Sequence, residues 1–507
     1  IFDWLRHLYA HLQYTVRFNG EHSSVFRALM GILIGDPASP TPWILYISDF
    51  HLHPHPDDVF LSGRRVSHLE LADDMAMISL SHWGMQSKLG QFEDYCSTSF
   101  LLANTVKTLA SVHGPLPPAL PPLMLYGSAL RYVETATLVG VTFTSSAPDI
   151  FREHSWQKVA AAERVASACY SLESYVGPLP PTVALQLYRA HVDAHLTAGC
   201  EIALDTHLPG PIAALERVQH TYLRRTLHIS SHSQLAPLYS ETGLWPIRYR
   251  QLHLALSYLR YVLTDKPPLP YAALWSLRTW SDLHGVAAAL PVAVVLPLEP
   301  MPTLAFVQRA HGELRASLAQ HLYTQLMHSQ RLPVLQHRLA RDACPPPPTL
   351  EHVCTLRDYL QLSTRPQRDA VTQLILSEHP LAIERLRRAP HVIPREWRVC
   401  RFCRKPWAVE DEVHVLLQCD AAPLASRRED YFEASHSLHP GLRKLYFRLS
   451  GAAFLDVALR SRDTLSLFAH FVADVFALCE QLPPLVLTSE DQLMALSHPP
   501  ASPPSEA

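Results

Sequence analysis

Two adjacent carboxylates, Asp73 and Asp74, stand between the apolar runs 66–71 and 75–80. Two short apolar segments joined by a few residues predict a strand-turn-strand hairpin, here with both carboxylates at its tip. Adjacent carboxylates resist joint ionisation and commonly ligate a divalent cation. The sequence therefore predicts a Mg²⁺ or Mn²⁺ site at this tip. A solvated surface turn is the alternative that the Asp-Asp dipeptide alone allows.

A second set of metal-ligand residues has the pattern Cys400-x₂-Cys403-x₁₀-His414-x₄-Cys419. Two Cys three residues apart present both sulfurs to one ion, and the His with the third Cys completes a tetrahedral set. We therefore expect this Cys₃His unit to bind Zn²⁺. The side chains around it suit phosphate contact and base stacking, and they are Arg401, Arg404, Lys405 and Trp407. A zinc unit with a purely structural role is the alternative.

Three histidines alternate along one short segment, at His51, His53 and His55, just before a further acidic pair. Alternate positions on a strand point the same way, so the three rings could ligate the metal of a hydrolase. Pro54 and Pro56 interrupt a strand here, which favours a solvated loop. A metallo-hydrolase is nevertheless kept as the second alternative function.

A glycine-rich run precedes the acidic pair by about one helix and a loop. It contains Gly31, Gly35, Asp36, Ser39 and Pro40 at fixed spacing. Glycines of this kind allow a bend in which the backbone approaches a ligand closely, and Ser-Pro is typical of the first turn of a helix. The run therefore predicts a bend that leads into a helix.

Together with the acidic hairpin, this bend resembles the palm of the reverse transcriptases of non-long-terminal-repeat (LINE-like) retroelements. Three more segments resemble the same family in the same order, and they are 16–23, 103–108 and 138–143. The resemblance implies an RNA-directed DNA polymerase whose partners are an RNA template, a DNA primer and deoxynucleotides. It also implies that Asp73 and Asp74 hold catalytic Mg²⁺.

The resemblance assigns further roles. Lys107 is implied as a catalytic residue that protonates the leaving pyrophosphate. The implied nucleotide and template contacts are Gly31, Gly35, Asp36, Ser39, Pro40 and Asn104. Leu71 stands where the family has Phe or Tyr, and Ile34 where it has Gln. The family has another metal-binding Asp on an earlier strand. No counterpart occurs here, so we expect an N-terminally truncated, incomplete palm, and such a truncation would remove polymerase activity.

Basic residues lie opposite an apolar stripe between residues 212 and 227. Arg217, Arg224 and Arg225 could contact the phosphates of a primer-template, and a solvated helix face is the alternative. The pattern Tyr239-x-Glu241-x-Gly243 that follows resembles the region after the palm in these elements. Used together with the Cys₃His unit, the arginines define the first alternative function, a non-catalytic nucleic-acid-binding remnant.

These residues need both strands and helices to position them, so we expect an α+β fold. Helices are predicted over 4–12, 39–50 and 83–96, with the second one buried, and a single strand over 138–143. The predicted regions are a partial palm (1–145), a helical thumb-like region (150–265), a Pro-rich linker (266–302), a helical region (303–397), the zinc-like unit (398–420), C-terminal helices (421–488) and a disordered tail (489–507).

Composition adds limits to these expectations. The chain has 507 residues, with 43 Lys and Arg against 46 Asp and Glu, so it lacks the basic excess typical of nucleic-acid enzymes. No apolar run approaches the ~20 residues of a membrane span, so no membrane partner is expected. Nine Cys without a signal peptide predict reduced thiols and a nuclear or cytoplasmic protein. No pattern indicates an oligomeric state.

Overall fold

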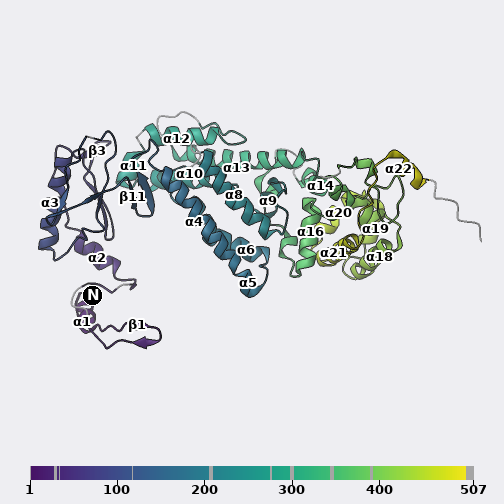
Figure 1. The fold of residues 1–507 in the computed structure, drawn as a ribbon, viewed down its shortest axis with the longest axis horizontal. Coiled ribbons are helices and arrows are strands. Elements are labelled where there is room, and N and C mark those ends of the chain that lie inside the picture. Colours follow the sequence, from purple (N-terminus) through teal and green to yellow (C-terminus); the bar gives the residue numbers. More distant parts are fainter. Residues whose placement is uncertain are drawn as a thin grey trace, which may run out of the picture. The chain divides into compact units, whose positions relative to one another are not determined.

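The structure is a computed structural model that describes residues 2–27, 31–33, 35–116, 118–204, 209–274, 277–296, 302–342, 348–388 and 392–497. The chain divides into two compact units, Ile1–Glu153 and His154–Ala507. The first unit mixes helices with short strands, whereas the second is helical (Figure 1). The expected α+β class is therefore confirmed, and each unit is described by itself.

Three helices of the first unit match predicted ones, α1 (Phe2–His11), α2 (Pro40–Ile47) and α3 (His82–Thr98). The Ser81 hydroxyl caps α3 by accepting a hydrogen bond from the Gly84 amide at 3.0 Å. The predicted burial of this helix is wrong, because α2 buries none of its residues, although Ser39 before it and Phe50 after it are buried. Apolar residues are buried only where another element covers them, and the core of this unit forms around α3 instead.

The strands of the first unit pair two by two within the described residues. Five pairs are antiparallel, and one, β7 with β10, is parallel. The pairs are β1 (Arg17–Phe18) with β2 (Glu21–His22), β3 (Val59–Leu61) with β4 (Arg64–Val66), β5 (His68–Leu71) with β6 (Asp74–Met77), β7 (Leu109–Ala110) with β10 (Arg131–Tyr132), β8 (Met124–Leu125) with β9 (Ser128–Ala129), and β11 (Thr135–Leu138) with β12 (Val141–Thr144).

One strand prediction is wrong. The segment 138–143 is not a single strand but crosses from β11 to β12. Val139 and Gly140 have φ of 51° and 78°, and two consecutive residues in this left-handed region reverse the chain. The apolar alternation around them continues on both sides of the turn, which is why the sequence pattern hides it.

A buried ion pair holds the first unit together beneath α3. Lys88 Nζ lies 2.6 Å from Asp58 Oδ1, and both side chains are fully buried. Arg65 contacts the other oxygen of Asp58 at 3.1 Å. Burial raises the pKa of Asp58, but hydrogen bonds from Lys88, the His55 amide and Arg65 outweigh this and hold the pKa at about 2.

The second unit consists of helices packed around one continuous apolar core. The helices are α4 (Arg152–Ser171), α5 (Glu173–Val176), α6 (Pro181–Leu187), α7 (Asp193–Thr197), α8 (Pro209–Thr226), α9 (Ala236–Thr242), α10 (Ile247–Asp265), α11 (Pro268–Ala273), α12 (Leu277–Ala288), α13 (Leu304–Met327), α14 (Pro333–Asp342), α15 (Leu350–Val353), α16 (Arg365–Leu376), α17 (Ala382–Arg385), α18 (Ala422–His436), α19 (Leu442–Arg448), α20 (Gly451–Arg460), α21 (Leu465–Gln481) and α22 (Glu490–Ser497). Shorter turns are the π-helices η1 (Tyr188–Val192) and η5 (His414–Gln418) and the 3₁₀-helices η3 (Asp358–Gln361) and η4 (Arg395–Trp397).

The apolar stripe predicted between residues 212 and 227 faces this core. Its members are all buried, and they are Ile212, Leu215, Val218, Tyr222, Leu223 and Leu227. The Pro-rich segment 266–302 contains α11 and α12, and Leu290 and Val294 within it join the same core. Part of the predicted tail forms α22, and residues 498–507 lie outside the described residues.

A buried carboxylate, Glu241, joins α9 to two later segments of the second unit. Arg338 of α14 donates a hydrogen bond to Glu241 Oε2 at 2.9 Å, and Tyr359 of η3 donates another at 3.0 Å. Gly243, with φ of 69°, follows at the end of α9, where an added Cβ would lie 2.8 Å from the Leu356 backbone nitrogen. The segment that resembles the post-palm region of retroelements therefore has a packing role here.

Candidate metal centre

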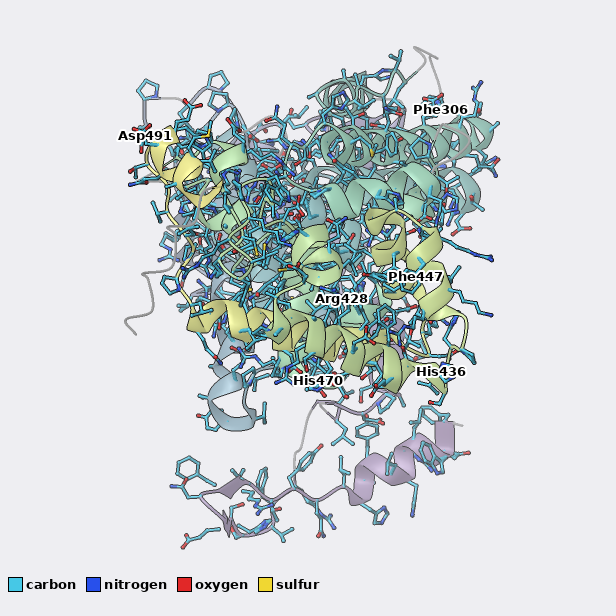
Figure 2. All side chains as sticks on the ribbon, turned by 90° about the vertical axis from the view of Figure 1, so that its right-hand side faces the viewer. Phe306, Arg428, His436, Phe447, His470 and Asp491 are labelled. Atoms are coloured by element: carbon cyan, nitrogen blue, oxygen red, sulfur yellow. The ribbon has the colours of Figure 1, made fainter. Side chains whose placement is uncertain are left out.

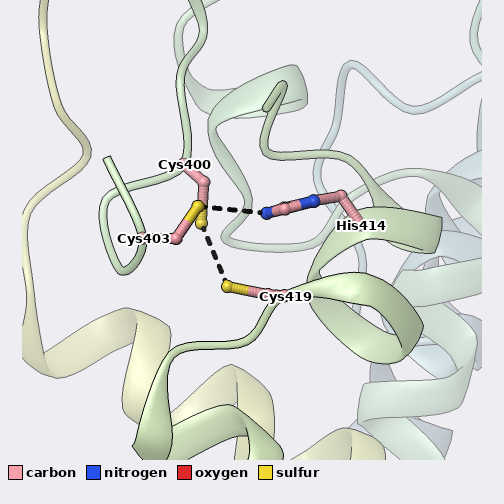
Figure 3. A group of neighbouring side chains, drawn as sticks. All are labelled: Cys400, Cys403, His414 and Cys419. Carbon is pink, nitrogen blue, oxygen red and sulfur yellow. Dashed lines mark hydrogen bonds between the residues drawn. The ribbon is translucent and has the colours of Figure 1, made fainter. Parts of the chain in front are cut away.

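The four residues of the predicted Cys₃His unit meet at one point in the second unit (Figure 3). One ligand atom from each lies within 4.8 Å of all the others. Cys400 and Cys419 are buried, whereas Cys403 and His414 are half-buried. The eight cysteines that the structure describes are free, so these sulfurs are not joined in a disulfide.

A short hairpin presents the first two ligands. Val399 and Val409 form an antiparallel bridge, and the Cys400 amide donates a hydrogen bond to the Ala408 carbonyl at 2.8 Å. Arg404 follows with φ of 50°, and its amide bonds back to the Cys400 carbonyl at 2.9 Å. This tight turn folds the Cys-x-x-Cys segment over on itself, so that both sulfurs point to the same side.

A π-helical turn presents the other two ligands. Residues five apart do not share a face of an α-helix, because each residue turns the chain by about 100°. The wider turn η5 makes an i to i+5 hydrogen bond, from the Cys419 amide to the His414 carbonyl at 2.7 Å. Asp411 caps the turn by accepting from the His414 amide at 2.9 Å. The π-turn is therefore what makes the His-x₄-Cys spacing suitable for one ion.

Two of the distances between ligand atoms equal those of a tetrahedral zinc site, and all of them lie within 4.8 Å. Tetrahedral bonds of about 2.3 Å to sulfur and about 2.05 Å to nitrogen place two sulfurs about 3.8 Å apart, and a sulfur and a nitrogen about 3.6 Å apart. Here Cys400 Sγ and Cys419 Sγ are separated by 3.8 Å. Cys403 Sγ lies 3.5 Å from His414 Nε2. The donor set and its spacing thus fit Zn²⁺, which would hold the hairpin and the π-turn together.

The electrostatics of the four side chains favour a thiolate at Cys419. The hydrogen bond from Cys400 lowers the pKa of the Cys419 thiol by more than burial raises it, and His414 lowers it further. The same contact and burial raise the pKa of Cys400. Thiolate is the form of cysteine that binds a metal ion, so the lowered pKa of Cys419 favours its role as a ligand.

Outer contacts fix the ligand-bearing backbone. Arg428 donates to the Leu416 carbonyl at 3.0 Å and to the Cys419 carbonyl at 2.7 Å. Arg401, predicted to suit phosphate contact, is instead buried, and its Nε bonds to Glu410 at 3.0 Å. Its Nη1 donates to the Cys479 carbonyl at 2.6 Å. This structural role was not predicted, since the sequence places Arg401 beside a ligand without showing its partner.

The acidic pair lies where the sequence predicts it, at the tip of the β5–β6 hairpin. Asp74 pairs with Leu71 across the turn, and both carboxylates are exposed. Ala72 has φ of 56°, a left-handed conformation that costs a non-glycine residue about 1 kcal/mol. Within the described residues, the Cys₃His set is the one cluster of three or more such ligands, so no third His, Cys or acidic side chain joins this pair.

The glycine-rich bend and the segment with Lys107 take defined conformations. Gly31 and Gly35 have φ of 100° and 84°, and the buried Ser39 hydroxyl closes the bend by donating to the Leu33 carbonyl at 2.7 Å. Ile34 lies outside the described residues. Asn104 Oδ1 accepts hydrogen bonds from the amides of residues 106 and 107 at 3.1 Å, which forms a turn. Lys107 is exposed on that turn.

Two of the three predicted nucleic-acid-binding arginines are held by the protein itself. Arg224 donates to the Ser233 carbonyl at 2.8 Å. Arg225 pairs with Glu173 at 2.8 Å and stacks on the Tyr170 ring, with its guanidinium carbon 4.0 Å from the ring centre. Arg217 is exposed on α8 and has no ion-pair partner in the part of the chain that the structure describes.

Of the three alternating histidines, His55 takes part in a network of hydrogen bonds that closes a turn. His51 and His53 are exposed. The His55 ring nitrogen Nδ1 accepts from the Asp57 amide at 3.2 Å, and the His55 amide donates to Asp58 at 2.9 Å. Over the described ranges, the three rings are not part of any cluster of three ligands.

Comparison of the sequence with protein-family models and with curated proteins finds no significant match to either. Among the helices that the structure describes, none combines the length and the apolar composition that crossing a membrane requires.

Proposed function

We propose that this chain carries an incomplete reverse transcriptase palm of the non-long-terminal-repeat retroelement type, a family of RNA-directed DNA polymerases. In this proposal Asp73 and Asp74 hold Mg²⁺ or Mn²⁺ and the chain takes an RNA template, a DNA primer and deoxynucleotides. The observation that carries the proposal is the exposed hairpin tip with two adjacent carboxylates, which follows the Gly31–Pro40 bend in the order of the family's motifs. The two open glycine conformations of that bend support it.

The chemistry sets a clear requirement. Divalent ions in such a site neutralise the attacking and leaving oxygens of a phosphoryl transfer. Two-metal transfer needs a further carboxylate, and none of the described side chains supplies it beside Asp73 and Asp74. The proposal therefore predicts metal binding by the pair as the property to measure first.

The test uses Mn²⁺, whose electron paramagnetic resonance signal falls on binding. We expect the full chain to bind Mn²⁺, Asp73→Asn to weaken this binding at least about ten-fold, and Asp94→Asn, an exposed acid on α3, to leave it unchanged. DNA synthesis on a primed RNA template that depends on Asp73 would establish polymerase activity. The proposal would be overturned if the chain neither bound Mn²⁺ nor synthesised DNA.

The second candidate function is a non-catalytic nucleic-acid-binding protein. One observation favours it: Trp407 is 77% exposed at the end of the Cys-x-x-Cys hairpin, near the exposed Arg404. An exposed indole beside cations suits stacking on an unpaired base. Mn²⁺-independent binding of RNA that is lost in Trp407→Ala, without DNA synthesis, would favour this candidate over the polymerase.

A further inference from the structure

The outer side of α19 combines an exposed aromatic ring with cations. Phe447 is 75% exposed, and Lys444 and Arg448 are exposed three residues before it and one residue after it. Positions i, i+3 and i+4 share one face of a helix, so these three side chains are neighbours. Figure 2 labels Phe447 among the side chains of the C-terminal helices. The three residues are called the α19 face below.

The cations of the α19 face are not neutralised by the protein. In the described residues, neither Lys444 nor Arg448 has an ion-pair partner. The nearby acids Glu429 and Asp430 are engaged with Arg443 at 2.7 Å and Arg427 at 3.8 Å. The sequence of α19 is Leu-Arg-Lys-Leu-Tyr-Phe-Arg, with three cations and no acid, although the whole chain has a net charge of −3. Because Arg443 is paired with Glu429, two cations of α19 are without an ion-pair partner in the described residues, and Glu433 of α18 is a further exposed acid.

The zinc-like unit fixes the position of this face. The inner side of α19 contributes Tyr446, whose hydroxyl donates to the carbonyl of Leu417, a residue of the π-turn η5, at 2.6 Å. The Tyr446 ring also packs edge-on against Phe454 at 5.5 Å. Phe447 packs edge-on against the Tyr446 ring, with 5.0 Å between the ring centres, and the rest of its side chain is exposed.

A single exposed ring is ordinary on a protein surface, and the flanking cations are what distinguish Phe447. An aromatic ring flanked by unpaired cations has the two features that bind single-stranded nucleic acid: a π-face for a base and positive charge for the phosphates on either side. The charge also selects among partners, because an apolar protein surface would leave Lys444 and Arg448 without counter-charges.

We propose that the α19 face is a binding site for single-stranded RNA or DNA, in which Phe447 stacks on a base and Lys444 and Arg448 contact the flanking phosphates. The site lies outside the palm-like segment and the zinc ligands. The inference rests on the proposed function only for its nucleic-acid partner, since it requires no polymerase chemistry.

The test measures binding of a fluorescent single-stranded oligonucleotide of about 12 nucleotides to the zinc-loaded full chain. We expect Phe447→Ala to weaken binding at least about five-fold, and Phe447→Leu to do nearly the same because leucine has no π-face. Tyr175→Ala is the matched control, since Tyr175 is 84% exposed on α5 beside the acidic Glu173 and should not matter.

The cations are tested by salt dependence. In the double variant Lys444→Ala/Arg448→Ala, the slope of log affinity against log salt should become smaller in magnitude by about 1.4. This change corresponds to the loss of two phosphate contacts on a single strand, at about 0.7 each. The charge-conserving Lys444→Arg/Arg448→Lys variant should keep the slope. Unchanged zinc content and circular dichroism verify that each variant is folded.

Two results would overturn the inference. One is binding by Phe447→Ala within about two-fold of the original chain. The other is full binding by Phe447→Leu, which would indicate an apolar contact such as a protein partner makes. Both can be distinguished from failure of the proposed function, which is judged by Mn²⁺ binding at Asp73 and Asp74.

Discussion

Replacing Glu241 with Gln should strongly destabilise the second unit around α9. Glu241 is fully buried and bonds to Arg338, Tyr359 and Ser240, the last through the Ser240 hydroxyl at 2.9 Å. Gln keeps the size of the side chain but removes its charge. It leaves the buried guanidinium of Arg338 without a counter-charge, and removing one partner of a buried ion pair commonly costs 3–5 kcal/mol.

The pKa of Glu241 gives an independent magnitude. Burial raises this pKa, but the charges of Arg338 and Arg357 and the hydrogen bonds outweigh it and lower it from 4.5 to about 2. A lowering of this size corresponds to about 3 kcal/mol of stability. Because the folded pKa is the lower one, this contribution is complete above about pH 4.5 and is lost as the pH falls towards 2. The penalty for an unpaired buried charge and the free energy that corresponds to the lowered pKa are thus both about 3 kcal/mol.

Hydrogen exchange followed by mass spectrometry measures this effect locally, without assuming two-state unfolding of a two-unit chain. At neutral pH, amides of α9 should exchange on the order of 100-fold faster in Glu241→Gln than in the original chain. The control is Glu173→Gln, which breaks the pair with the half-exposed Arg225 and should change exchange by less than about three-fold. Equal, small effects of the two variants, or a Glu241→Gln effect that does not shrink at low pH, would refute the reasoning.

Three further predictions concern other features. Gly243→Ala should cost about 3 kcal/mol, because it adds a contact with the Leu356 backbone to the strain of a positive φ. Gly140→Ala, with φ of 78° in the two-residue β11–β12 turn and open space around it, should cost only about 1 kcal/mol in urea unfolding. Asp58→Asn should destabilise the first unit by about 3 kcal/mol at pH 7, because it leaves the buried Lys88 without a counter-charge. The difference in stability between the variant and the original chain should vanish as the pH falls towards 2, the folded pKa of Asp58. A difference that does not depend on pH would contradict the Lys88 ion pair. Elemental analysis should find one zinc per chain, and Cys403→Ser should lose it. Removal of the zinc by a chelator should speed hydrogen exchange over residues 398–420. The absence of zinc from the original chain would rule out the metal centre.

The candidate metal centre could be predicted as a set of residues but not as a geometry. Cys-x-x-Cys has one common folded form, a tight turn, so its spacing is informative by itself. The His-x₄-Cys spacing is not, because in an α-helix it would place the two ligands on different faces. It becomes suitable through the π-turn η5, which Asp411 caps from three residues upstream and Arg428 of the next helix, α18, braces by its bond to the Cys419 carbonyl.

For the charged residues, too, the sequence predicts which residues form a set but not the contacts that they make. The basic face of α8 is evident from helical periodicity, but Arg224 and Arg225 bond to Ser233 and Glu173, and only Arg217 among the three is exposed without an ion-pair partner in the described residues. Arg401 is likewise used internally. A sequence shows which face of a helix is polar, whereas the acids and carbonyls opposite that face come from distant segments.

By itself the sequence determined the local features: the Asp73–Asp74 hairpin, the apolar stripe of α8 and the composition of the Cys₃His set. These depend on side-chain periodicity and on turn chemistry within a few residues. Only the tertiary structure decided that α2 is exposed, that Glu241 is buried among cations, and that the α19 face is left open beside the metal centre. The physical reason is that burial and neutralisation depend on which distant element lies opposite a residue, and the periodicity of one segment carries no information about its partner.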